Sequence, residues 1–101
     1  MTTIRLISEN AKGLNTPEKR SLALTDFHRQ KAEIVFIQET HFCKDSAPTL
    51  RNRRYPTGYF SHFTGAKARG VGILMGSQVP FTFNKQETDK AGRYIFVSGT
   101  I

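Results

Sequence analysis

Two polar residues, Asn10 and Glu39, occupy positions where chemistry at a metal ion or a phosphate group could take place. Glu39 directly follows residues 34–38, whose mostly β-branched or aromatic apolar run is typical of a strand buried on both faces. In open α/β sheets, ligands bind outside the carboxyl ends of the strands. A carboxylate at such an end can bind a metal ion or act as an acid or base. A solvated glutamate at a strand end is the simpler interpretation of the same pattern.

The elements that must position these residues form a strand–helix–strand unit. Residues 4–8 predict a first short strand, and residues 34–38 predict a second. Between them, Thr16 can cap a helix that begins at Pro17 and ends near Gln30. Two strands joined by a helix favour a parallel pair with a right-handed crossover. The pattern therefore predicts an α/β fold.

A parallel pair would place Asn10 and Glu39 at the same edge of the sheet, because the carboxyl ends of the two strands lie together. Asn10 is also close to Gly13, and asparagine near glycine is most often a turn residue. Each residue therefore has a structural interpretation when it is taken alone. Their common edge is the reason to consider them together as a site.

The rest of the chain predicts an irregular connection and then several strands. The connection covers residues 42–58, and its basic residues at 51–54 are either DNA contacts or a solvated charged surface. Proline cannot donate to a β-ladder, so a strand that starts at Pro80 should lie at a sheet edge. The strands are expected at residues 59–63, 70–75, 80–84 and 93–101.

Glycine and phenylalanine residues in this second half have structural interpretations. Gly70 and Gly72 lack the surrounding pattern of a phosphate-binding loop, so close strand packing explains them better. The phenylalanines are expected in the core rather than as platforms for base stacking: Phe60, Phe63, Phe81, Phe83 and Phe96.

The composition limits the class of protein. The 101 residues fit one domain or part of one, and the net charge of +7 favours an anionic partner such as nucleic acid. No apolar run reaches the roughly 18 residues of a membrane span, and the N-terminus lacks the pattern of a secretory signal. The single cysteine, Cys43, excludes an internal disulfide. We therefore expect an intracellular protein that is not secreted and has no membrane partner, in a compartment such as the nucleus.

Several segments of the chain, in order, are similar to one known family. They are residues 8–15 (SENAKGLN), 17–20 (PEKR), 36–41 (FIQETH), 67–74 (KARGVGIL) and 89–95 (DKAGRYI). Together they resemble the endonuclease domain of non-LTR (LINE-type) retrotransposons. That domain belongs to the exonuclease–endonuclease–phosphatase superfamily, which includes the apurinic/apyrimidinic endonucleases and DNase-I-like enzymes.

The resemblance implies a fold and a domain context. The fold would be the N-terminal half of a four-layer α/β sandwich of the DNase-I-like type, with a mixed sheet and one covering helix. Residues 1–101 would form the N-terminal part of the endonuclease domain, which is normally fused to the rest of that domain and to a reverse transcriptase. Half a sandwich would expose an apolar face, so marginal stability or self-association is expected.

The resemblance also implies an activity, which is metal-dependent hydrolysis of phosphodiester bonds in DNA. The nicks would prime reverse transcription at the target site. Glu39 matches the glutamate that binds Mg²⁺ or Mn²⁺, and Asn10 matches the asparagine that helps build the phosphate and metal site. The family's downstream Asp-x-Asn and Ser-Asp-His motifs do not occur in this sequence. We therefore expect the chain alone to be catalytically inactive.

Three basic residues are candidate DNA contacts: Lys12, Lys67 and Arg69. Lys12 departs from the family, which usually has Asn or Asp there, and its charge could pair with a phosphate or weaken metal binding. Lys67 and Arg69 have a simpler interpretation as the charged tip of a hairpin. His41, two residues beyond Glu39, is expected to be a surface or hydrogen-bonding histidine.

Two other functions are compatible with the sequence. One is a phosphomonoesterase of the same superfamily that acts on small phosphates, although the charge of +7 argues against it. The other is a non-catalytic remnant that binds nucleic acid through its basic surface. Such a remnant would bind DNA with a steep salt dependence, and magnesium would not affect that binding.

Overall fold

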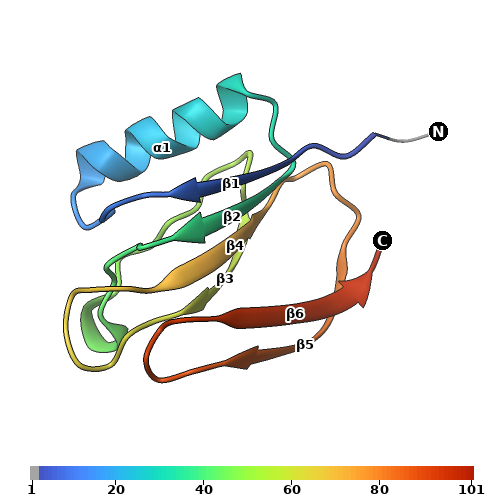
Figure 1. The fold of residues 1–101 in the computed structure, drawn as a ribbon. Helices are drawn as coiled ribbons and strands as arrows, with labels where there is room; N and C mark the ends of the chain where they lie inside the picture. Colours follow the sequence, from blue (N-terminus) through green and yellow to red (C-terminus); the bar gives the residue numbers. More distant parts are fainter. Residues whose placement is uncertain (1–2) are drawn as a thin grey trace.

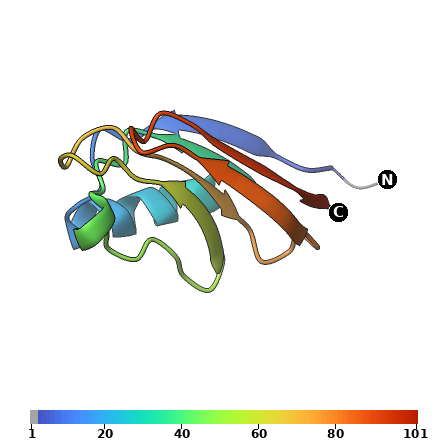
Figure 2. The same ribbon diagram turned by 90° about the horizontal axis from the view of Figure 1, so that it is seen from below.

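The computed structural model describes residues 3–101, which form one mixed four-stranded sheet, one long helix and a separate two-stranded sheet (Figure 1). The four-stranded sheet has the order β1-β2-β4-β3. Figure 2 shows the helix on one side of this sheet and the two-stranded sheet on the other. The elements are β1 (Leu6–Asn10), α1 (Pro17–Arg29), β2 (Ile34–Gln38), the short 3₁₀ helix η1 (Lys44–Ser46), β3 (Thr57–Ser61), β4 (Val71–Met75), β5 (Thr82–Thr88) and β6 (Ile95–Thr100).

The expected strand–helix–strand unit is confirmed. Strands β1 and β2 pair in parallel, and Asn10 at the end of β1 lies opposite Gln38 at the end of β2. Strand β2 has the predicted bounds, but β1 runs two residues later than the predicted 4–8. The reason is the register, because Leu6 pairs with Ile34, and only residues opposite β2 can join its ladder.

Helix α1 begins and ends as the sequence predicts. The Thr16 side chain accepts a hydrogen bond from the Lys19 N–H at 3.2 Å, and Pro17 occupies the first turn. A proline is favourable there because its missing N–H would have no partner inside the helix. The helix turns Leu24 and Phe27 into the core.

The main core lies between α1 and the four-stranded sheet. Phe27 is fully buried and meets Tyr55 edge to face, with 6.2 Å between the ring centroids. Val35 and Leu74 cover the sheet side of this core. Each such side chain contributes roughly 1.5–3 kcal/mol when it leaves water, so this layer holds the helix in place.

A second, smaller core lies on the opposite face of the sheet. Its buried members are Ile34, Ile73 and Met75, and Ile95 and Val97 of β6 pack against them. The β5–β6 sheet covers only part of this face, because Leu6 on β1 remains 58% exposed. Leu6 is therefore an exposed apolar side chain on this face, and the marginal stability or self-association expected for half a sandwich stays a prediction.

Two of the five phenylalanines expected in the core are exposed. Phe96 is 63% exposed and Phe83 is 45% exposed, so the expectation was wrong for them. Successive strand residues face opposite sides. Because Ile95 and Val97 face the core, Phe96 between them must face solvent. Phe83 stacks on Tyr59, with 5.2 Å between the centroids, at the rim of the small core.

The bounds of the four later strands also differ from the prediction because pairing partners set them, and β4 differs least, since it covers Val71–Met75 instead of 70–75. Strand β3 covers Thr57–Ser61 instead of 59–63, in antiparallel register with β4. Strand β5 covers Thr82–Thr88 instead of 80–84, since it pairs along β6. Strand β6 begins at Ile95 instead of Arg93, because the Arg93 and Tyr94 N–H groups donate to the Asp89 carboxylate.

The mixed sheet and its covering helix agree with the expected fold class. The irregular connection before β3 is also confirmed, with η1 as its one helical turn. Within residues 3–101, no helix combines the length and the apolar composition that a membrane crossing requires.

We predict that Tyr55→Phe destabilises the fold by about 1–3 kcal/mol, because the buried Ala32 carbonyl loses a hydrogen-bond donor. The Tyr55 hydroxyl donates to that carbonyl at 2.7 Å, and Tyr55 is 2% exposed. Urea unfolding followed by circular dichroism measures the change. Tyr94→Phe is the matched control, since Tyr94 is 42% exposed. Equal stabilities of the two variants would contradict the role of this bond.

Candidate functional site

The candidate site lies where β1 and β2 end side by side. Hydrogen bonding between the two chain segments continues past the strands, since the Ala11 N–H donates to the Gln38 carbonyl at 2.8 Å and the Gly13 N–H donates to the Glu39 carbonyl at 2.8 Å. This continued pairing holds Asn10 beside Glu39. The sequence expectation that the two residues share one edge of the sheet is confirmed.

The backbone around the site adopts an uncommon conformation. Lys12, Glu39 and His41 all have left-handed backbone angles, with φ of 52°, 55° and 61°. Residues other than glycine rarely adopt this region, and such strain concentrates at functional sites. Tertiary hydrogen bonds hold the strained segment in place, because the Thr40 N–H donates to the Gly70 carbonyl at 3.1 Å and the His41 N–H donates to the Arg69 carbonyl at 2.7 Å.

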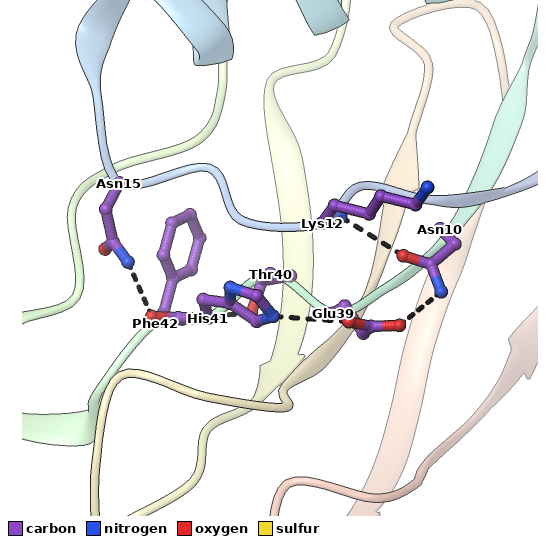
Figure 3. A network of polar contacts seen from close by, with 7 residues as sticks. All are labelled: Asn10, Lys12, Asn15, Glu39, Thr40, His41 and Phe42. Carbon is purple, nitrogen blue, oxygen red and sulfur yellow. Dashed lines mark hydrogen bonds and ion pairs between the residues drawn. The ribbon is translucent and has the colours of Figure 1, made fainter.

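A chain of polar contacts joins the side chains of the site (Figure 3). The Asn10 amide nitrogen donates to one carboxylate oxygen of Glu39, and the Lys12 N–H donates to the Asn10 amide oxygen at 3.1 Å. The other Glu39 oxygen lies 3.3 Å from His41 Nε2. Asn15 holds the His41 backbone, with its amide nitrogen donating to the His41 carbonyl at 2.6 Å.

These contacts keep Glu39 ionised. The hydrogen bond from Asn10 has the largest effect and lowers the pKa of Glu39 below its ordinary value, and the contact with His41 lowers it further. These hydrogen bonds outweigh the opposing effect of burial, and the charge interactions with His41 and Lys12 lower the pKa by smaller amounts. At neutral pH the site therefore presents a carboxylate.

The donor set is compatible with a magnesium or manganese ion. Magnesium takes one or two protein carboxylates and completes its shell with water and phosphate oxygens. Glu39 supplies an ionised and exposed carboxylate that retains free lone pairs beside its two contacts. Within residues 3–101 there is no group of three or more His, Cys, Asp or Glu side chains that could form a complete protein cage for a metal.

The predicted DNA-contacting residues lie on loops near this edge. Lys12 is close enough to Glu39 for its charge to lower the pKa of the carboxylate. Arg69 is tied to the site through its carbonyl, and its guanidinium lies over the Phe63 ring at 4.7 Å. Lys67 is exposed in the same β3–β4 loop, without a described side-chain contact to Asn10 or Glu39.

Close packing at two glycines agrees with the sequence analysis. A Cβ on Gly70 would collide with the Thr40 hydroxyl, and a Cβ on Gly72 would collide with the Phe60 ring. Gly70 also has a φ of 89°, which favours glycine. Thr40 itself is fully buried, and the sequence analysis did not identify it. Its place directly after Glu39 was the only signal that could have indicated a supporting role.

Asp89 is a second polar residue that the sequence analysis missed. Its carboxylate accepts hydrogen bonds from the Arg93 N–H at 2.7 Å and from the Tyr94 N–H at 3.4 Å. Burial alone would raise the pKa of Asp89, but these bonds, a bond from Ser61 and the Arg93 charge together lower it. The Asp-Lys-Ala-Gly sequence at 89–92 is typical of a turn and could have indicated this structural role.

A scan against protein-family models finds no match to this chain. The resemblance to the retrotransposon endonucleases therefore depends on the sequence segments described above.

We predict that Asn10→Ala raises the pKa of Glu39, because the strongest hydrogen bond to the carboxylate is lost. The pH dependence of the Glu39 side-chain carboxyl ¹³C shift measures this change. Asn84→Ala, on the exposed strand β5, is the control and should leave the pKa unaltered. An unchanged pKa in Asn10→Ala would show that Asn10 does not set the charge of Glu39.

The sign of the pH effect on stability follows from the direction of the shift. A pKa that is lower in the folded state stabilises the fold above the unfolded pKa, and this contribution is lost as the pH falls through the folded value. The difference in stability between the wild type and Asn10→Ala should therefore be present at neutral pH and disappear in acid.

Proposed function

We propose that this protein takes part in metal-dependent hydrolysis of phosphodiester bonds in DNA, as an endonuclease domain of the kind found in non-LTR retrotransposons. The observation that carries the proposal is the contact between Asn10 and an ionised Glu39 where β1 and β2 end. The resemblance of the sequence segments supports the same function. DNA would be the partner, and Mg²⁺ or Mn²⁺ the cofactor.

Each residue of the site has a distinct role in this proposal. Glu39 would hold the metal, which, when bound, polarises a phosphoryl oxygen and stabilises charge on the leaving oxygen. Asn10 is a positioning residue, because both ends of its amide are engaged, one with Glu39 and one with the Lys12 N–H. It orients the carboxylate and keeps it ionised. His41 restrains the second carboxylate oxygen.

The basic residues around the site would bind the DNA backbone. Lys12, Lys67 and Arg69 lie on two loops at one edge of the sheet, and the chain carries a net charge of +7. Phosphate contacts of this kind give affinity and position without sequence specificity. Lys12 has a double effect, because it attracts phosphate and also opposes a cation at Glu39.

A non-catalytic DNA-binding function is the second candidate. It is favoured by the charge of Lys12 near the carboxylate and because residues 3–101 contain no group of three or more His, Cys, Asp or Glu side chains that could hold a metal ion. In that case the basic loops would bind DNA, and Glu39 would only help to order them. The two functions differ in whether a divalent metal binds at Glu39.

We predict that Mn²⁺ binds at Glu39 and broadens the amide NMR signals of residues 10–12 and 38–41. Glu39→Gln removes the charged ligand while preserving the shape of the side chain, so the selective broadening should disappear. Glu87→Gln, on the exposed strand β5, should broaden like the wild type. Broadening that persists in Glu39→Gln would refute the metal assignment and favour the non-catalytic candidate.

A plasmid-nicking assay addresses the activity itself. The downstream Asp and His motifs are not in this sequence, so we expect the chain to bind metal and DNA without nicking. Magnesium-dependent nicking by this chain that Glu39→Gln abolishes would overturn the expected inactivity and leave the metal assignment intact.

We predict that the double variant Lys67→Gln/Arg69→Gln binds a short DNA duplex more weakly than the wild type. If both side chains contact phosphates, the slope of log affinity against log salt should fall by about 2, since each contact contributes about 0.9. Fluorescence anisotropy over a range of salt concentrations measures the slope. Lys31→Gln/Lys85→Gln is the matched control, because Lys31 lines a cleft with Gly76 at the other end of the sheet and Lys85 lies on the exposed strand β5. Equal slopes in the two double variants would exclude the β3–β4 loop as a DNA contact.

A further inference from the structure

A second polar cleft lies beside the end of β3. It has a volume of about 360 Å³, and its lining includes Lys44, His62, Thr64 and Lys90. None of these residues belongs to the Asn10–Glu39 contacts. The cleft brings together residues from the start of η1, from the segment after β3 and from the segment after β5.

Backbone pairing explains why the two lysines flank the same opening. Phe63 pairs with Cys43 in parallel and with Ala91 antiparallel, so three chain segments lie side by side. This register puts Thr64 between Lys44 and Lys90, and the Thr64 N–H donates to the Lys90 carbonyl at 3.1 Å. Residues directly paired on neighbouring strands project to the same side. The two lysines therefore stand on either side of Thr64.

His62 lies on this same side of the segment, because it is two residues from Thr64. Its ring stacks on Phe60, with 5.8 Å between the centroids, and meets the edge of Phe42 at 5.9 Å. The intervening residue, Phe63, lies beneath Arg69 instead. The cleft thus has an aromatic floor with a histidine and a rim with two lysines.

The His62 ring carries an unexplained polar atom. Nδ1 is buried and has no hydrogen-bond partner among residues 3–101. Buried polar atoms are nearly always paired, so an orphan atom at a cleft requires an explanation. Burial lowers the pKa of His62, which leaves a neutral ring with one nitrogen able to donate and one able to accept.

The acidic residue of the cleft does not cancel the lysine charges. Asp89 is the one acid among the lining residues, and its Oδ1 is directed at the backbone N–H groups of Arg93 and Tyr94 and at the Ser61 hydroxyl. These bonds orient the carboxylate toward its own turn, and the lining carries two lysine charges against one carboxylate charge. Lys44 and Lys90 remain for an anion from outside the chain.

We propose that this cleft is a phosphate-binding site, in which Lys44 and Lys90 pair with the phosphate oxygens and the His62 ring rotates within its stack on binding, so that the buried Nδ1 forms a hydrogen bond to the same group. Ammonium groups suit phosphate, since bonds between ionised partners are short and strong. The phosphate could belong to a nucleic acid backbone or to a small phosphorylated molecule. The proposal holds whether or not Glu39 binds a metal.

The test is a titration of the ¹⁵N-labelled chain with inorganic phosphate at constant ionic strength. We expect saturable shifts of His62 Nδ1 and of the Thr64 and Lys90 amides. Lys44→Gln/Lys90→Gln should weaken phosphate binding by about tenfold or more, because two charged hydrogen bonds are lost. Lys31→Gln/Lys85→Gln removes the same charge elsewhere and should bind like the wild type. Linear shifts, or equal affinities in the two double variants, would overturn the proposal.

His62→Phe provides a second variant that preserves the stacking on Phe60. It should weaken phosphate binding by removing Nδ1, without lowering the thermal stability, since the orphan atom is removed as well. Unchanged phosphate affinity in this variant would exclude the ring nitrogen from the site. The two readouts together separate a loss of binding from a loss of folding.

A short DNA duplex distinguishes the two sources of phosphate. If Lys44→Gln/Lys90→Gln weakens duplex binding more than Lys31→Gln/Lys85→Gln does, the natural ligand is a nucleic acid backbone. If only the affinity for inorganic phosphate changes, the ligand is a small phosphorylated molecule. If neither affinity changes, the cleft is not a phosphate site.

Discussion

The parallel pairing of β1 with β2, continued past the ends of both strands, is the constraint on which the candidate site depends. The bonds from Ala11 to Gln38 and from Gly13 to Glu39 keep the two segments together after the ladder has ended. Asn10 is already held by the ladder opposite Gln38, and the extension keeps Glu39, which follows β2, beside it. Helix α1 makes the pairing possible, because its buried face covers the sheet and its length spans the crossover.

Segments from the second half of the chain, the β3–β4 loop and the turn before β6, are joined to this edge by backbone hydrogen bonds. In the β3–β4 loop, the Arg69 and Gly70 carbonyls accept hydrogen bonds from the segment after Glu39, and the Gly70 N–H donates to the Gly92 carbonyl at 3.0 Å. The backbone is strained at three residues with left-handed angles, Lys12, Glu39 and His41. The long-range hydrogen bonds keep these residues in that conformation. The site is thus a product of long-range hydrogen bonds that hold an unfavourable local conformation. Its basic residues lie on the same loops that provide those bonds.

The two faces of the sheet were predictable to different degrees. The helix face follows from the pattern of β2 and α1, where buried residues recur at strand and helix spacing. The other face depends on β5 and β6, whose inward residues the sequence pattern did not identify. Phe96 is of a residue type that is usually buried, but its neighbours Ile95 and Val97 pack against the core. Because successive strand residues face opposite sides, the Phe96 side chain faces solvent.

The sequence by itself determined the strand–helix–strand unit and the common edge of Asn10 and Glu39. Capping at Thr16, the proline at 17 and the apolar run of β2 are local signals, and the crossover rule turns them into a shared edge. Only the tertiary structure decided the rest, including the contact of His41 with Glu39, the start of β6 at Ile95 and the cleft at His62. Phe63 pairs with Cys43, 20 residues earlier, and with Ala91, 28 residues later. No local period in the sequence encodes a pairing at such a separation.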